Sequence, residues 1–215
     1  MNYKQTTNGN HYSEQPINTG VFGQYYCYND ILQKLYERMN FMTSKHARVL
    51  FVRFDIRFPH GYETSGRNVE IGWLFKVLQE NANNNGIHLA YVWVRECKSS
   101  SLPHYHAVLM VDGRKVRNYR NLLMEVERIW GRVLGTNAKG LIDWCDKPHG
   151  IHSGENGVML QQPLRDATRI EQDHQQQEFD HNYKRCFERA SYLAKVSQKE
   201  DTPHGVRRFG CSQLR

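Results

Sequence analysis

The sequence predicts an α+β fold in which helices pack on one mainly antiparallel β-sheet. Segments with the two-residue period of strands alternate along the chain with segments that have the period of helices. Two of the expected strands, residues 89–96 and 104–111, flank a short polar loop, which is typical of an antiparallel hairpin. Around this hairpin the elements run strand, helix, strand, strand, helix (βαββα). That order favours a single sheet with helices packed on it.

The length and charge indicate one globular domain with a polyanionic partner. The chain has 215 residues, enough for one sizeable core, and it carries a formal net charge of +7. Residues 1–23 are rich in Asn, Thr, Gly and Gln, so we expect them to form a flexible N-terminal arm. Residues 24–215 are expected to form the domain, with a basic C-terminal tail.

The cysteines and the hydropathy pattern predict a cytoplasmic protein. The five cysteines are dispersed and form no C-x-x-C pair, which indicates a reducing compartment. No apolar run is long enough to span a bilayer, and the polar N-terminal residues contain no signal-peptide segment. We therefore expect no membrane association.

The first helix and the first long strand have clear local signals. Residues 29–42 carry apolar side chains at helical spacing. In residues 48–59 the even positions from 50 onward are apolar, whereas Arg53, Asp55 and Arg57 share the other face. That second face is either solvated or placed to contact phosphates.

The remaining expected elements are helices at residues 67–81, 118–134 and 181–199 and short strands at residues 140–145 and 157–161. The first of these helices has an apolar stripe made of Val69, Trp73, Leu74, Val77 and Leu78. Gly135 is the expected stop of the second. Residues 161–177 are rich in glutamine, and they are either weakly structured or the poorly marked start of the last helix.

A pair of histidines on the second strand of the hairpin is a candidate metal site. Side chains on a strand alternate between faces, so His104 and His106 point the same way and Tyr105 points into the opposite layer. Glu96 ends the first strand of the hairpin and is expected beside His104. Two imidazoles and one carboxylate on one sheet face would supply three ligands to a divalent ion. A His-x-His pair also occurs by chance, and the carboxylate is what favours the metal site.

The last helix places its two tyrosines on opposite sides. On a helical wheel, four cationic side chains lie within about 60° of Tyr192, namely Arg185, Arg189, Lys195 and Lys199. Tyr183 falls in the apolar stripe on the other side, where aromatic residues usually belong to the core. We therefore expect Tyr192 to be presented to solvent with a pKa lowered by the surrounding positive charge.

Together these motifs resemble those of the HUH single-strand endonucleases. The signature of that superfamily is His-hydrophobic-His on a central strand and Tyr-x-x-Lys on a helix. The matching segments are Pro103-His104-Tyr105-His106 and Tyr192-Leu193-Ala194-Lys195. The chain from about Arg48 onward also looks like the YagK/YfjJ C-terminal domain family of prophages and filamentous phages. The segments that carry this second resemblance are Arg53-Phe54-Asp55, Trp93 to Lys98, the His-Tyr-His strand, Arg189 to Lys195 and Arg207 to Cys211.

The resemblance implies a fold with an HUH/RRM-like βαββα core and a nuclease activity. Tyr192 would attack single-stranded DNA at an origin or hairpin and form a 5′-phosphotyrosine, with Lys195 stabilising the reacting charge. His104, His106 and Glu96 would bind a divalent ion, for which mixed imidazole and carboxylate ligands favour Mn²⁺ and tolerate Mg²⁺. The candidates for DNA-backbone contacts are Arg53, Arg57, Arg185, Arg189, Arg207 and Arg208.

The resemblance also implies a role in rolling-circle replication of a phage or prophage in the cytoplasm of a bacterial host. The chain has no G-x-x-x-x-G-K-[ST] motif, so unwinding would need a host helicase or another separate enzyme. Two other functions remain open: a prophage regulator that binds nucleic acid without catalysis, and a transposase or relaxase of the same superfamily.

Overall fold

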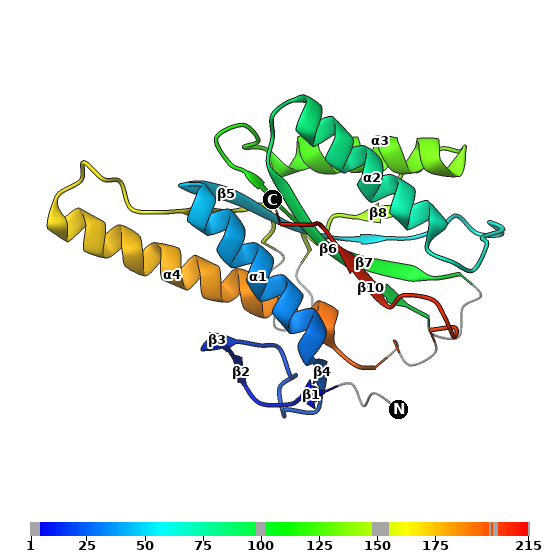
Figure 1. The fold of residues 1–215 in the computed structure, drawn as a ribbon, viewed down its shortest axis with the longest axis horizontal. Helices are drawn as coiled ribbons and strands as arrows, with labels where there is room; N and C mark the ends of the chain where they lie inside the picture. Colours follow the sequence, from blue (N-terminus) through cyan, green and yellow to red (C-terminus); the bar gives the residue numbers. More distant parts are fainter. Residues whose placement is uncertain (1–4, 98–101, 148–154, 198, 200–201, 215) are drawn as a thin grey trace.

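The sheet that the sequence predicts is present and is antiparallel throughout the described part of the chain. A computed structural model describes residues 5–97, 102–147, 155–197, 199 and 202–214 (Figure 1). Within these ranges one sheet has six strands, in the order β10-β6-β7-β5-β8, with β9 also paired to β5. The strands are β5 (Arg48–Ile56), β6 (Leu89–Glu96), β7 (His104–Asp112), β8 (Ile142–Asp143), β9 (Val158–Gln161) and β10 (Phe209–Cys211). The α+β fold class is therefore confirmed.

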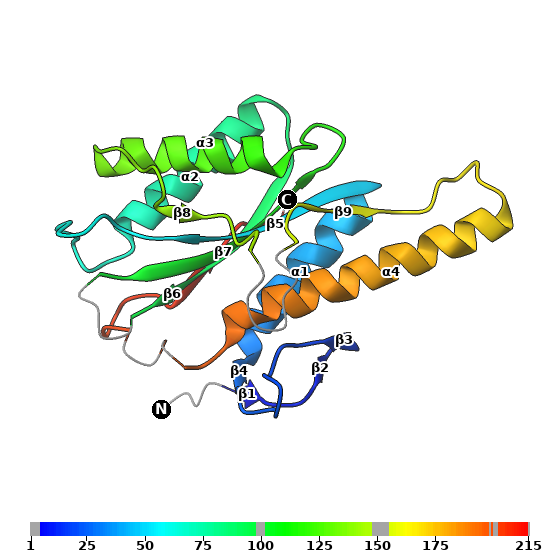
Figure 2. The ribbon, with the colours of Figure 1, turned by 180° about the vertical axis from the view of Figure 1, so that it is seen from behind.

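Helices cover both faces of this sheet. Helices α2 (Val69–Asn84) and α3 (Tyr119–Leu134) lie on one face, and α1 (Asn29–Lys45) and α4 (Arg169–Ser191) lie on the other (Figures 1 and 2). The segment β5-α2-β6-β7-α3 is the expected βαββα unit. None of the described helices has the length and apolar character that crossing a bilayer requires.

Strand β5 is buried on both faces, which explains where its charges lie. Its even positions pack under α2 and α3, and its odd positions Val49 and Phe51 pack under α1 and α4. Arg53 and Asp55 continue the second row and are each only 8% exposed. The charged face is thus closed at Arg53 and Asp55, whereas Arg57, just beyond the end of the strand, is exposed.

The apolar stripe expected on α2 is partly wrong. Val69 and Trp73 are 48% and 51% exposed, and the helix buries Ile71 and Phe75 instead. Both stripes share Leu74 and Leu78, so the helix is rotated relative to the expected orientation. The sheet selects the side with the longer continuous apolar row, which is made of Ile71, Leu74, Phe75, Leu78 and Ala82.

The last helix begins earlier and ends earlier than the sequence indicates. Thr168 and Glu171 form a reciprocal capping box, so the Gln-rich segment is the start of α4. The helix ends at Ser191 and a single 3₁₀ turn, η1 (Tyr192–Ala194), follows it. The chain then becomes extended at Lys195, and the helical wheel therefore does not describe the residues beyond that point.

The segment expected to be a flexible arm is packed on the domain over its described part. Strand β1 (Thr6–Thr7) pairs with β4 (Cys27–Tyr28), and β2 (His11–Tyr12) pairs with β3 (Gln15–Pro16). The side chain of Ile17 is buried in the core between α1 and α4, and the N–H of Asn18 donates to Ser191 Oγ at 2.7 Å. Backbone pairing thus gives order to a polar sequence. The basic tail is likewise partly a strand, because β10 pairs with the edge of β6.

We predict that Ser191→Ala lowers the free energy of unfolding by about 1–3 kcal/mol, because the buried amide of Asn18 loses this acceptor. Ser44→Ala is the matched control, since the exposed Ser44 hydroxyl only bonds the Phe41 carbonyl of its own helix. That control should stay within about 0.5 kcal/mol of the wild type in urea unfolding. Equal midpoints for both variants would show that the arm does not depend on this bond.

Candidate active site

Strand register brings the candidate ligands together. Asp55 of β5 pairs with His106 of β7, and Glu96 of β6 pairs with His104. Because side chains alternate, all four belong to the sheet face that α1 and α4 cover. The prediction that Tyr105 points into the other layer is also confirmed, since it is buried in the core under α2 and α3.

Asp55, His104 and His106 form a possible metal-binding triad. Each offers one ligand atom, and these atoms lie within 4.8 Å of one another. Asp55 Oδ1 is 2.6 Å from Nδ1 of His106, and Asp55 Oδ2 is 3.7 Å from Nε2 of His104. Asp55 therefore occupies the place in the triad that sequence reasoning gave to Glu96.

Glu96 lies next to the triad, with one carboxylate oxygen near His106 and the other bonded to Lys199. Its Oε2 is 2.9 Å from Nε2 of His106, although the two groups are not aligned as a hydrogen bond. Its Oε1 accepts a hydrogen bond from Nζ of Lys199 at 2.6 Å. Glu96 thus binds a lysine and adjoins one triad imidazole, which leaves it as a neighbour of the cluster.

A buried ring nitrogen favours a metal ion at this position. Nε2 of His104 is buried and has no hydrogen-bond partner, whereas Nε2 of His106 is buried beside the unaligned carboxylate of Glu96. A buried polar atom without a hydrogen-bond partner is rare inside proteins, and coordination of an ion would account for the one on His104. Two imidazoles and one carboxylate are also ligands that divalent first-row metals accept. The residues present therefore fit a divalent cation.

The two histidines differ in their readiness to bind a cation. Burial, together with the neighbouring His106, lowers the pKa of His104 to about 4, so its imidazole is neutral at physiological pH. Burial also disfavours the charged form of His106, but the carboxylates of Asp55 and Glu96 outweigh it and raise the pKa of His106. A metal ion would therefore compete with a proton for His106 more than for His104.

Lys199 lies beside Glu96, in a position that the helical wheel of the last helix did not predict. It was expected on the exposed basic face of the last helix, yet its side chain is fully buried against Glu96. Burial lowers the pKa of Lys199, and the charge of Glu96 only partly offsets this. Burial opposes ionisation of Glu96 as well, but His106 and Lys199 hold the pKa of Glu96 at about 2. Both side chains of this pair are buried, with Nζ of Lys199 2.6 Å from Oε1 of Glu96.

Tyr192 lies beside this cluster, in the 3₁₀ turn that follows α4. Its ring meets the ring of His106 edge to face, with centroids 5.6 Å apart, and the guanidinium of Arg53 is 4.8 Å from the Tyr192 centroid. Burial and the charge of Glu96 raise the pKa of Tyr192, against the opposing effect of Arg53. The expected lowering of this pKa was therefore wrong, because burial of the phenol, together with the carboxylates of the strands, outweighs the effect of Arg53.

Tyr183 belongs to the core, as predicted. It is 7% exposed, and its hydroxyl donates to Oδ1 of Asn40 at 2.6 Å. The whole apolar stripe expected around it is buried between α1 and α4, namely Tyr183, Cys186, Phe187, Ala190, Leu193 and Ala194. Tyr192 is thus the tyrosine of this segment that reaches the site.

Lys195 lies between two aromatic rings. Its Nζ is 3.6 Å from the ring centroid of Tyr25 and 5.5 Å from that of Tyr192. The backbone of Lys195 forms an antiparallel bridge with Cys27. The N-terminal segment therefore contributes Tyr25 to the surroundings of the site, which no sequence motif indicated.

Among the arginines proposed to contact DNA, Arg53 is the one whose side chain reaches a residue of the cluster. It lies 3.7 Å from Asp55 and over Tyr192, as given above, and its buried Nε has no hydrogen-bond partner. Arg189 donates to the carbonyl of Cys145. Arg57 and Arg185 form ion pairs on the surface, with Asp143 and Glu155 respectively.

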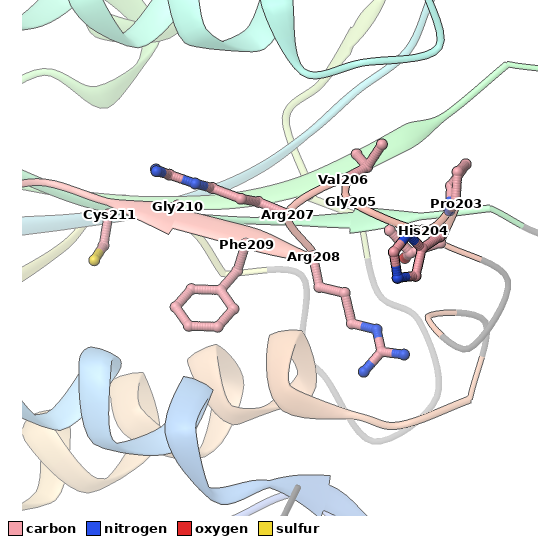
Figure 3. A pocket seen from close by; sticks show the side chains of 10 residues that line it. Pro203, His204, Gly205, Val206, Arg207, Arg208, Phe209, Gly210 and Cys211 are labelled. Atoms are coloured by element: carbon pink, nitrogen blue, oxygen red, sulfur yellow. The ribbon is translucent and has the colours of Figure 1, made fainter. Parts of the chain in front are cut away.

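Arg207 and Arg208 lie farther along the chain, in a segment that lines a cavity beside β10 (Figure 3). Arg208 and Phe209 point from this segment toward the helical layer of α1 and α4 (Figure 3). The guanidinium of Arg208 is 5.4 Å from the ring of Tyr28. His149 and His152, to which the sequence assigns no role, lie outside the described residues.

We predict that the triad binds Mn²⁺ and that His104→Ala with His106→Ala abolishes binding, since two ligands are lost. Asp55→Asn should weaken the affinity by at least about 10-fold, because a carboxylate that ligates or orients an imidazole contributes this much. The affinity of the wild type and of each variant can be measured by titration calorimetry. Asp173→Asn, an exposed site on α4, should bind like the wild type. Normal affinity in Asp55→Asn would remove Asp55 from the triad.

We further predict that Glu96→Gln lowers the free energy of unfolding by about 3–5 kcal/mol, because it leaves the ammonium of Lys199 buried without its counter-charge. Combining Glu96→Gln with Lys199→Met should recover much of this loss, since neither charge is then buried. Denaturant unfolding of the two single variants and the double variant gives the coupling energy. Additive losses would contradict the buried ion pair.

Comparison with known proteins agrees with the motifs of the chain. A sequence model of the YagK/YfjJ C-terminal domain matches residues 15–212. The chain is also 22% identical over 202 residues to "Uncharacterized protein YagK" of Escherichia coli (strain K12), an alignment that covers 84% of this chain and 91% of the relative. No solved structure matches the chain. Because the match spans nearly the whole sequence, the protein belongs to the YagK/YfjJ C-terminal domain family.

Proposed function

We propose that this protein is a metal-dependent nuclease that nicks and rejoins single-stranded DNA through a covalent bond to Tyr192. The observation that carries the proposal is the contact between Tyr192 and His106, which puts a tyrosine ring beside the possible metal-binding triad. A core tyrosine needs no such neighbours, as Tyr183 illustrates. A nucleophile for phosphoryl transfer needs cationic groups that attract and orient the phosphate.

The reaction is a transesterification. The phenol oxygen of Tyr192 attacks phosphorus and loses its proton, the bond from phosphorus to the 3′ oxygen breaks, and that oxygen gains a proton. The products are a 5′-phosphotyrosine and a free 3′-hydroxyl, and rejoining is the reverse. A divalent ion, when bound, polarises the phosphate oxygens and favours in-line attack.

The residues of the chain supply the remaining requirements. Arg53 and Lys195 hold positive charge near the ring of Tyr192, where the anionic phosphate would lie. The raised pKa keeps Tyr192 protonated and unreactive until the site gains positive charge. Mn²⁺ is the ion best suited to the mixed ligand set, with Mg²⁺ as the alternative.

The biological setting of this activity is the initiation of rolling-circle replication of a phage or prophage in a bacterial cytoplasm. The resemblance of the His-Tyr-His and Tyr-x-x-Lys segments to those of HUH replication initiators supports it. The substrate is a single-stranded origin or hairpin. A host helicase or another separate enzyme unwinds the duplex, because the chain has no P-loop motif.

We predict that Tyr192→Phe forms no covalent adduct with single-stranded DNA, because only the missing hydroxyl can make the phosphotyrosine bond. The variant should fold and bind DNA, since phenylalanine preserves the ring that packs on His106. The measurement is a denaturing gel of the protein incubated with a labelled oligonucleotide from a prophage origin and Mn²⁺.

Three controls make this test specific. Tyr183→Phe should form the adduct at a near-normal rate and lose only about 1 kcal/mol of stability, because its hydroxyl bonds Asn40 in the core. Lys195→Ala should slow adduct formation by about 100-fold without abolishing it. EDTA should prevent the adduct in the wild type. An adduct that persists in Tyr192→Phe, or a wild type that forms none on any DNA strand, would favour a non-catalytic binder.

A further inference from the structure

The loop of residues 20–26, which we call the aromatic loop, exposes large apolar side chains next to the candidate site. Phe22 is 90% exposed, more than any other large apolar side chain in the described part of the chain. Its neighbour Val21 is 72% exposed, and Tyr26 is 53% exposed. Single exposed apolar residues are common on protein surfaces. Three of them on one short loop call for a further explanation.

The tip of the aromatic loop is held in one conformation. The N–H of Gly23 donates to the carbonyl of Gly20 at 3.2 Å and closes a turn. Both glycines have positive φ, 82° at Gly20 and 65° at Gly23, which other residues adopt with strain. The side chain of Gln24 accepts from the N–H of Phe22 at 2.9 Å. Phe22 is therefore presented by a built turn, and the order of that turn does not come from burying its ring.

The base of the loop is attached to the segment that carries Tyr192. The carbonyl of Tyr26 accepts from the N–H of Val196 at 2.8 Å, and Tyr25 lies under the ammonium of Lys195. Phe22 is three positions before Tyr25, so their Cα atoms are within about 11 Å of each other. The exposed rings therefore belong to the same short loop as Tyr25, whose ring shares the ammonium of Lys195 with the ring of Tyr192.

The chemistry of this surface fits unpaired nucleobases. Aromatic rings that alternate with cations bind single-stranded nucleic acid, because the bases stack on the rings while the cations neutralise the phosphates. Lys195 on Tyr25 and Arg208 on Tyr28 provide cations beside the loop. A protein partner would need a larger apolar surface than these few side chains offer.

We propose that Phe22 and Tyr26 form a stacking platform for bases of single-stranded DNA next to the phosphate that Tyr192 attacks. This inference rests on the proposed function, because the strand bound by the platform is the substrate of Tyr192. Phe22 and Tyr26 are positioning residues: they hold the strand in register while the cluster of Asp55, His104 and His106 acts on the phosphate.

The test measures DNA binding in the full-length Tyr192→Phe protein, so that cleavage does not interfere. Fluorescence anisotropy with a labelled oligo(dT) strand gives the dissociation constant. Phe22→Ala and Tyr26→Ala should each raise it by about 5- to 150-fold, the effect of losing one base–aromatic stack. Phe22→Trp should bind at least as tightly as the parent protein, whereas Phe22→Leu should behave like Phe22→Ala. Ile170→Ala is the matched control, since Ile170 is 83% exposed at the other end of α4.

A second strand separates stacking from charge. On a deoxyribose-phosphate strand of equal length without bases, Phe22→Ala should bind no more weakly than its parent. Equal losses on both strands would overturn the platform, as would unchanged binding of oligo(dT). Thermal melting checks the fold, which an exposed ring should not affect.

The outcomes for the two proposals are distinguishable. A wild type that forms no adduct, together with ring-dependent binding in the Tyr192→Phe background, would end the nicking proposal and keep the DNA platform. A normal adduct together with unchanged binding in Phe22→Ala would end the platform and keep the nicking proposal.

Discussion

The register of three strands is the constraint on which the site depends. Pairing places Asp55 beside His106 and Glu96 beside His104, and a slip of one residue would send one partner of each pair to the opposite face. The apolar residues fix this register, because both faces of the strands are buried under helices. Packing far from the site therefore determines which polar groups meet in it. Once the apolar cores on the two faces of the sheet have formed, the strands already hold these polar side chains next to one another.

The same burial makes the charge balance of the cluster sensitive to what it binds. The carboxylates of Asp55 and Glu96 face Lys199 and His106, and they raise the pKa of His106. A divalent ion held by the triad would add positive charge to the cluster. Arg53 adds a further positive charge at the edge, beside Tyr192. On the proposed function, the cluster would thus become an attractive site for an anionic phosphate only after binding the ion.

Local periodicity predicted most of the fold and part of the site. The βαββα order, the shared face of His104 and His106, and the division between Tyr183 and Tyr192 all follow from a repeat of two or of 3.6 residues. The end of α4 could not be predicted in this way, because the residues after Ser191 are good helix formers with no glycine or proline until Pro203. Tertiary contacts end the helix there: the amide of Asn18 bonds Ser191, and Lys195 pairs with Cys27. Those contacts come from a segment whose polar composition predicted disorder.

The pKa of Tyr192 illustrates why no single sequence motif predicts the electrostatics of the site. A helical wheel includes the charges of a single element, and on that basis four cations surround the phenol. In the folded chain, burial and the carboxylate of Glu96 from the neighbouring strand raise its pKa, and Arg53 of another strand only opposes them. The acidity of Tyr192 is therefore controlled first by its burial and then by charges on the strands, which a helical wheel does not include. Since the same carboxylates adjoin the possible metal-binding triad, any cation held there would also favour the phenolate, which couples occupancy of the triad to the reactivity of the tyrosine.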